Sequence, residues 1–132
     1  MRAVDTNILV RLLEQDHPAQ TAAAEAFQQH GGPLWVSHIV LVETVWVLLT
    51  SFSRTKKEIL GVLDALVSNT DIHLQEASTV GAALTSYKAS KADFSDCLAL
   101  EVARANGHLP LATFDKHLAK LPDTVLPKSQ FH

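Results

Sequence analysis

Short apolar runs alternate with longer amphipathic stretches along the whole chain. The apolar runs carry β-branched or aromatic residues and are too short for helices, which favours strands. Predicted strands lie at residues 1–5, 34–36, 72–74, 109–113 and 124–126. Predicted helices run from Thr6 or Asn7 to about residue 13, over 19–30, from Ser37 through Glu43, over 56–67, 76–89 and 93–106, with a helical turn at 116–120.

Capping and breaking residues support these boundaries. Ser37 and Thr55 precede apolar helical stretches and predict N-caps, and Pro18 suits a first helical turn. The run Gly31-Gly32-Pro33 ends one helix, and Gly107 stands at the position after a helix where a left-handed conformation is common. The alternation of short apolar strands with helices predicts an α/β fold, a parallel sheet with helices on both faces.

Length and composition indicate a folded globule. The chain has 132 residues, 47% of them hydrophobic and 19% charged, which predicts a single domain over residues 1–132 with a real core. A net charge of −3 argues against nonspecific coating of nucleic acid, although it permits a local basic rim.

Membrane and secretory features are not expected. The single cysteine, Cys97, excludes an internal disulfide framework and fits a reducing cytoplasm. Met1 leads directly into a strand-like segment rather than a signal peptide. The apolar run from Ile39 to Leu49 is too short to span a bilayer. We therefore expect a cytoplasmic protein with no membrane partner.

Four acidic residues lie in apolar sequence surroundings, where a carboxylate is costly. Glu43 interrupts an apolar helix, Asp5 follows the first strand, Asp96 precedes Cys97-Leu98, and Asp115 follows an apolar strand. A buried unpaired carboxylate costs several kcal/mol or loses its charge. A fourfold repetition predicts that these acids gather around a cation.

The type of ligand indicates which cation this is. Oxygen-only ligands select Mg²⁺ or Mn²⁺ over Zn²⁺, and the seven histidines are scattered without zinc spacing. Asp5 and Asp115 follow predicted strands, at the edge where α/β proteins bind ligands. Carboxylates holding one or two Mg²⁺ ions are suited to phosphodiester hydrolysis.

Each acid also has an ordinary structural interpretation. Asp5 and Asp93 can be helix caps, Asp96 can favour the dipole of its helix, and Asp115 can open a turn. Glu43 has the weakest such interpretation, because a helix that is apolar on most sides should not carry a lone acid.

Four segments of the chain resemble the acidic motifs of PIN-domain ribonucleases, and most closely those of VapC-type toxins of bacterial toxin–antitoxin systems. They are Asp5-Thr6-Asn7-Ile8-Leu9-Val10-Arg11, Val42-Glu43-Thr44-Val45-Trp46-Val47-Leu48, Ala92-Asp93-Phe94-Ser95-Asp96-Cys97-Leu98-Ala99 and Ala112-Thr113-Phe114-Asp115-Lys116. The resemblance covers nearly the whole chain. It implies a three-layer α/β/α fold with a short central parallel sheet.

The resemblance also implies an activity and its residues. The activity is endonucleolytic RNA cleavage with Mg²⁺ or Mn²⁺. The implied metal ligands are Asp5, Glu43, Asp96 and Asp115. Asp93 is implied as a secondary acid on roughly the same helix face as Asp96, Thr113 as a hydroxyl beside the last acid, and Asn7 as a polar neighbour of the first. The implied partners are the RNA substrate, a cognate antitoxin and a second copy in a homodimer.

Two other functions stay open at this stage. A haloacid-dehalogenase-like phosphatase needs a second Asp two residues after the first, where this chain has Asn7. A non-catalytic PIN-like binding module is expected to have lost acids. Trp46 is predicted as core rather than as a stacking platform. Basic side chains that could contact phosphates are Arg11, Lys88, Lys91, Lys116 and Lys120.

Overall fold

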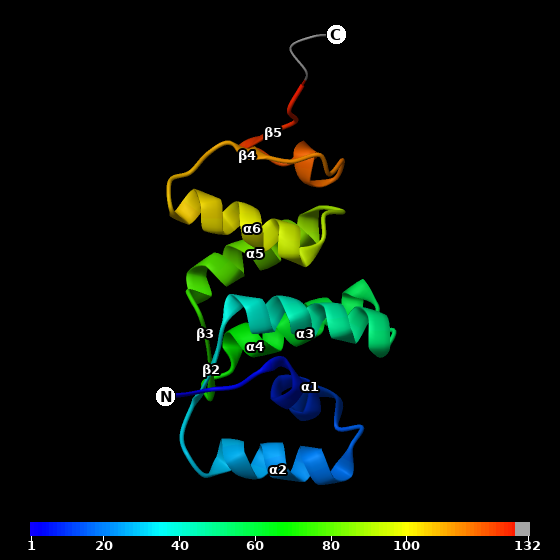
Figure 1. Ribbon diagram of the computed structural model, residues 1–132, viewed down its shortest axis with the longest axis vertical. Helices are drawn as coiled ribbons and strands as arrows, with labels where there is room; N and C mark the ends of the chain where they lie inside the picture. The colour runs from blue at the N-terminus through cyan, green and yellow to red at the C-terminus, as the bar shows by residue number, and fades with distance from the viewer. Residues whose placement is uncertain (129–132) are drawn as a thin grey trace. The chain divides into compact units, whose positions relative to one another are not determined.

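The computed structural model describes residues 1–128 and separates into two compact units, Met1–Ala77 (unit 1) and the part from Ser78 onward (unit 2) (Figure 1). The elements are β1 (Arg2–Ala3), α1 (Thr6–Glu14), α2 (Pro18–Gln29), β2 (Leu34–Val36), α3 (His38–Ser51), α4 (Lys56–Ser68), β3 (Ile72–Leu74), α5 (Ala77–Ala89), α6 (Phe94–Ala105), β4 (Leu111–Ala112), the 3₁₀ turn η1 (Leu118–Lys120) and β5 (Thr124–Val125). Every strand and helix predicted from the sequence is present within residues 1–128, and each unit is described below by itself.

The sheet of unit 1 is parallel, with strand order β1-β2-β3. Leu34 pairs with Ile72 and Val36 with Leu74, and all four side chains are buried on one face. Between them, Trp35 pairs with His73 on the opposite face, where both side chains are more exposed. The period of two residues therefore decides which face of the sheet contributes to the core.

Helix caps fix how the chain leaves the strands of unit 1. The hydroxyl of Ser37 accepts from the backbone N–H of Val40 at 3.2 Å and starts α3 directly after β2. Thr55 and Glu58 form a capping box at the start of α4, which contacts β3. Helix α1 is capped by Asp5, not by Thr6 or Asn7 as predicted, because the acid before them reaches the free N–H groups first.

Unit 2 is built on a shorter parallel pair. Strands β4 and β5 pair through Leu111 with Thr124 and through Ala112 with Val125. Phe94, the first residue of α6, is buried and meets Tyr87 of α5 edge to face, with ring centroids 5.8 Å apart. This contact holds the start of α6, where two of the predicted site residues lie, against the end of α5.

The fold is α/β with short parallel strands, as predicted. The expectation of one domain over residues 1–132 stays a prediction. None of the helices in residues 1–128 combines the length and apolar character that a bilayer crossing needs.

Candidate metal centre

Unit 1 contributes two of the predicted ligands, joined by a hydroxyl. Asp5 follows β1, and its Oδ1 accepts from the backbone N–H of Ile8 at 3.0 Å. The next residue, Thr6, donates from Oγ1 to Oε2 of Glu43 on α3 at 2.9 Å. Thr6 thus connects the first acidic motif to the second, although only the acids and Asn7 were predicted at this site. The position of Thr6, a hydroxyl residue directly after the first acid, is the sequence feature that could have indicated this role.

The expectation that Glu43 lies on a buried face of its helix is wrong. Glu43 is exposed, and it lies between Ile39 and Trp46, which are 71% and 64% exposed. The expectation of Trp46 as core is wrong for the same reason. Helix α3 is apolar around most of its circumference, so the sequence pattern does not indicate which face of the helix is buried. The residues it does bury are Leu41, Thr44, Val45 and Leu48.

Unit 2 contributes three acids at the start of α6 and after β4. Asp93 occupies the N-cap position of α6 but makes no side-chain cap hydrogen bond, so the interpretation of Asp93 as an ordinary cap lacks its defining contact. Asp96 lies in the first turn of the same helix and is half-buried. Asp115 is exposed, and its Oδ1 accepts from the backbone N–H groups of His117 and Leu118 at 3.0 and 2.8 Å.

The three acids of unit 2 share an electrostatic environment. Burial raises the pKa of the Asp96 carboxyl, and the negative charges of Asp115 and Asp93 raise it further. The phenol of Tyr87 also has a raised pKa, first from burial and then from the charge of Asp93. These effects identify Asp96 as the acid whose ionised form is least favourable without a nearby cation.

Thr113 supports Asp115 through the backbone. Its Oγ1 accepts from the backbone N–H of Asp115 at 3.0 Å. Together with the bonds to Asp115 Oδ1, this contact fixes the turn that presents the carboxylate. The predicted role of Thr113 beside the last acid therefore has a defined geometry, acting on the main chain of Asp115.

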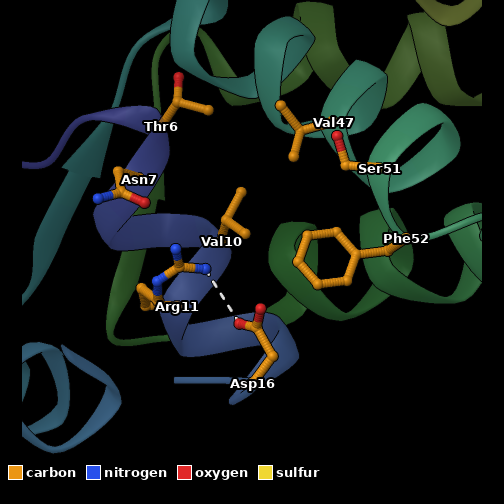
Figure 2. Close-up of a pocket in the computed structure, with 8 residues that line it drawn as sticks. All are labelled: Thr6, Asn7, Val10, Arg11, Asp16, Val47, Ser51 and Phe52. Atoms are coloured by element: carbon orange, nitrogen blue, oxygen red, sulfur yellow. Dashed lines mark hydrogen bonds and ion pairs between the residues drawn. The ribbon is translucent and has the colours of Figure 1, made fainter. Parts of the chain in front are cut away.

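Asn7 lies at the mouth of a cavity of unit 1, together with Thr6 and Arg11 (Figure 2). Arg11, one of the basic residues that the sequence suggested as phosphate contacts, donates hydrogen bonds to Gln20 and Asp16. In unit 2, Lys91 and Lys120 line a second cavity of about 320 Å³.

The donor atoms within each unit are carboxylate oxygens, which suit a hard cation. Asp5 and Asp115 each use Oδ1 for a local cap, which leaves Oδ2 for a ligand. Among residues 1–128, no group of three or more His, Cys, Asp or Glu side chains is close enough to hold an ion. The pKa of Asp96 still responds to both neighbouring acids, because charges act over longer distances than ligation does.

Parallel strands followed by carboxylates, with oxygen donors rather than a zinc-type ligand set, are typical of α/β proteins that bind hard cations at the ends of their strands. A family model described as "PIN domain" matches residues 2–123, and the chain belongs to the PIN domain family. PIN domains are typically metal-dependent nucleases. Comparison with curated proteins and with solved structures gives no match. The matched range contains all the predicted site residues, and it leaves no support for a haloacid-dehalogenase-like phosphatase.

Proposed function

We propose that the chain is an endoribonuclease that cleaves RNA phosphodiester bonds with Mg²⁺ or Mn²⁺ held by Asp5, Glu43, Asp96 and Asp115. The observation that best supports this proposal is the environment of Asp96. Its carboxyl is half-buried, and burial and two neighbouring acids raise its pKa. A bound cation relieves the repulsion among these three acids. Without a cation, the clustered carboxylates would only lower the stability of the fold.

In this proposal some side chains bind the cation, and others orient the carboxylates that bind it. The cation would activate a water and offset charge on the phosphate, as divalent ions do in nucleases. Thr6 restricts the carboxylate of Glu43 by donating to Oε2, which leaves Oε1 for a ligand. Asp115 is fixed differently: its backbone N–H donates to Thr113, and its Oδ1 accepts from the N–H groups of His117 and Leu118. Asp93 is a positioning acid that keeps the local field negative.

The test is cleavage of single-stranded RNA by the purified full chain. Cleavage should require Mg²⁺ or Mn²⁺, stop with EDTA, and fall to background in the Asp96→Asn protein. Glu76→Gln is the matched control, because Glu76 is an exposed acid outside both groups of predicted ligands. Equal cleavage by the parent and by Asp96→Asn, or cleavage indifferent to EDTA, would show that these acids are not the catalytic centre.

The biological setting belongs to the same proposal. The resemblance to VapC-type motifs supports a cytoplasmic toxin that is inhibited by a cognate antitoxin. The exposed apolar residues Ile39, Trp46 and Leu49 on α3 support a homodimer. A neighbouring gene product should bind the chain and suppress cleavage. Sedimentation of the parent and of Trp46→Glu tests the dimer, which should dissociate in the variant.

A non-catalytic PIN-like module is the second candidate. It would bind RNA or protein with the same affinity in the presence and absence of metal, and it would cleave nothing. The presence of all four implied ligands disfavours it, since a binding module has no use for a half-buried acid beside two others.

A further inference from the structure

A cavity of about 430 Å³ opens in unit 1 between α1 and the C-terminal half of α3 (Figure 2). This volume lies in the range of small-ligand sites and is large enough to admit a nucleobase. Thr6 and Asn7 line one end, Val10 and Val47 line the middle, and Phe52 lies at the other end.

The cavity has an apolar wall. Figure 2 shows the side chains of Val10, Val47 and Phe52 directed into the same space. Val10 is buried, and Val47 and Phe52 are half-buried, so their surfaces toward the cavity remain accessible. Flat aromatic rings bind well against such walls, and bases of single-stranded RNA are commonly held by stacking on aromatic and apolar side chains.

One polar group at the rim is held in a fixed position. Arg11 donates from Nε to Gln20 Oε1 at 2.6 Å and from Nη1 to Asp16 Oδ1 at 3.0 Å. Within residues 1–128, no hydrogen bond engages its Nη2. A guanidinium fixed by two acceptors with a nitrogen left over is suited to an acceptor on a base edge, because little side-chain entropy is lost on binding.

The cavity is linked to the unit 1 acids through Thr6. Thr6 both lines it and donates to Glu43, and Val47 lies one helical turn after Glu43 on α3. A nucleotide next to a phosphate held at Asp5 and Glu43 would therefore be close to residues that line this opening.

We infer that this cavity is a nucleobase subsite, which receives the base of one nucleotide flanking the scissile phosphate and sets a sequence preference for cleavage. The inference rests on the proposed endoribonuclease function and adds a position of specificity to it. The apolar wall supplies affinity, and Arg11 and the amide of Asn7 supply hydrogen bonds that distinguish bases.

Filling the cavity is the direct test. Ser51 is the exposed last residue of α3 and lines the opening, so Ser51→Trp should occlude it without disturbing the core. Ser68→Trp is the matched control, because Ser68 is the exposed last residue of α4 and lies outside the cavity. Each protein is given an RNA pool with a randomised segment, and the cut ends are sequenced.

The parent and Ser68→Trp should share a base preference at one position beside the cut, and Ser51→Trp should reduce it by about fivefold or more. Arg11→Lys keeps the charge but loses the planar fork, and it should change which base is favoured. An unchanged preference in Ser51→Trp overturns the subsite while leaving cleavage by the parent, and hence the proposed function, intact. A parent that cleaves no RNA contradicts the function itself.

RNA binding provides a second measurement in case Ser51→Trp abolishes cleavage. In an Asp96→Asn background, fluorescence anisotropy measures binding of short labelled RNAs of different base composition. Ser51→Trp should weaken binding and equalise affinities among compositions, whereas Ser68→Trp should not. If Ser51→Trp binds every RNA as its background does but loses a protein partner, the cavity receives a protein segment and the inference is wrong.

Discussion

The two units place their candidate carboxylates in different environments. In unit 1, Asp5 and Glu43 are exposed and each accepts a hydrogen bond, from Ile8 N–H and from the Thr6 hydroxyl. In unit 2, Asp96 is half-buried, lies near two other acids and has a raised pKa. The unit 1 pair accepts hydrogen bonds from its own neighbours, while burial and two nearby acids disfavour the ionised form of Asp96 in unit 2.

This difference separates two uses of an acid that sequence alone treats alike. An exposed carboxylate with a local donor can be replaced by an amide at small cost to folding, because the amide oxygen can accept the same hydrogen bond. A carboxylate held among other acids opposes folding when it is ionised. Substitutions in the two units should therefore act alike on catalysis and differently on stability.

The largest expected effect is on cleavage. Asp5→Asn and Asp96→Asn should each lower the rate of RNA cleavage by about 100-fold or more, since each removes a charge that holds the cation. Asp93→Asn should lower it less. The measurement is the cleavage rate of each variant under single-turnover conditions with Mg²⁺. Asp71→Asn is the control, because Asp71 is an exposed acid elsewhere in unit 1.

Two results would break this part of the comparison. Full activity of Asp5→Asn would remove unit 1 from the catalytic centre. Damage by Asp93→Asn equal to that by Asp96→Asn would make Asp93 a ligand rather than a positioning acid.

The next effect is on metal-linked stability. Mg²⁺ or Mn²⁺ at 100 times its dissociation constant should stabilise the parent by about 2.7 kcal/mol, a rise of several degrees in melting temperature. Asp96→Asn should gain less from metal. Thermal unfolding at pH 7.5 with EDTA or metal measures both. A parent melting curve that is unmoved by either metal contradicts a shared metal centre.

Much of the fold follows from local chemistry. Ser37 and Thr55 were predicted as caps, and α3 and α4 begin directly after them, because a cap needs only N–H groups within one turn. The strands at 34–36 and 72–74 were likewise predicted with their observed bounds. The candidate acids were identifiable because an acid in an apolar run contradicts the surrounding pattern.

Burial and contact geometry did not follow in the same way. Glu43 and Trp46 were expected in apolar surroundings, but both are exposed, because an all-round apolar helix has no preferred face in sequence. The bond from Thr6 to Glu43 joins residues 37 positions apart and depends on how α1 packs on α3. The cavity beside them depends on the same packing, so no local pattern predicts it.

A smaller effect tests the contact within unit 1. Thr6→Val removes the donor to Glu43 and should lower cleavage several-fold, while changing the free energy of unfolding by only about 1 kcal/mol. Thr6→Ser should restore the rate, since it keeps the hydroxyl. Thr50→Val is the matched control, because its hydroxyl donates only to the backbone carbonyl of Trp46. A Thr6→Val protein as active as Thr50→Val would show that Thr6 does not orient Glu43.

The smallest effect is the pH dependence of stability in EDTA, and it distinguishes the units most directly. The pKa of Asp96 is higher in the folded chain than in the unfolded chain, so between these two pKa values the folded state binds more protons. The free energy of unfolding should therefore fall as pH rises through that window and level off above the raised pKa. Asp96→Asn should flatten this dependence and be more stable than the parent at pH 7.5, while Glu43→Gln should leave the dependence in place. The change is small because Asp96 is only half-buried and solvent screens its neighbours. Urea unfolding from pH 4 to pH 8 measures it, and a slope that survives in Asp96→Asn would assign it to another group.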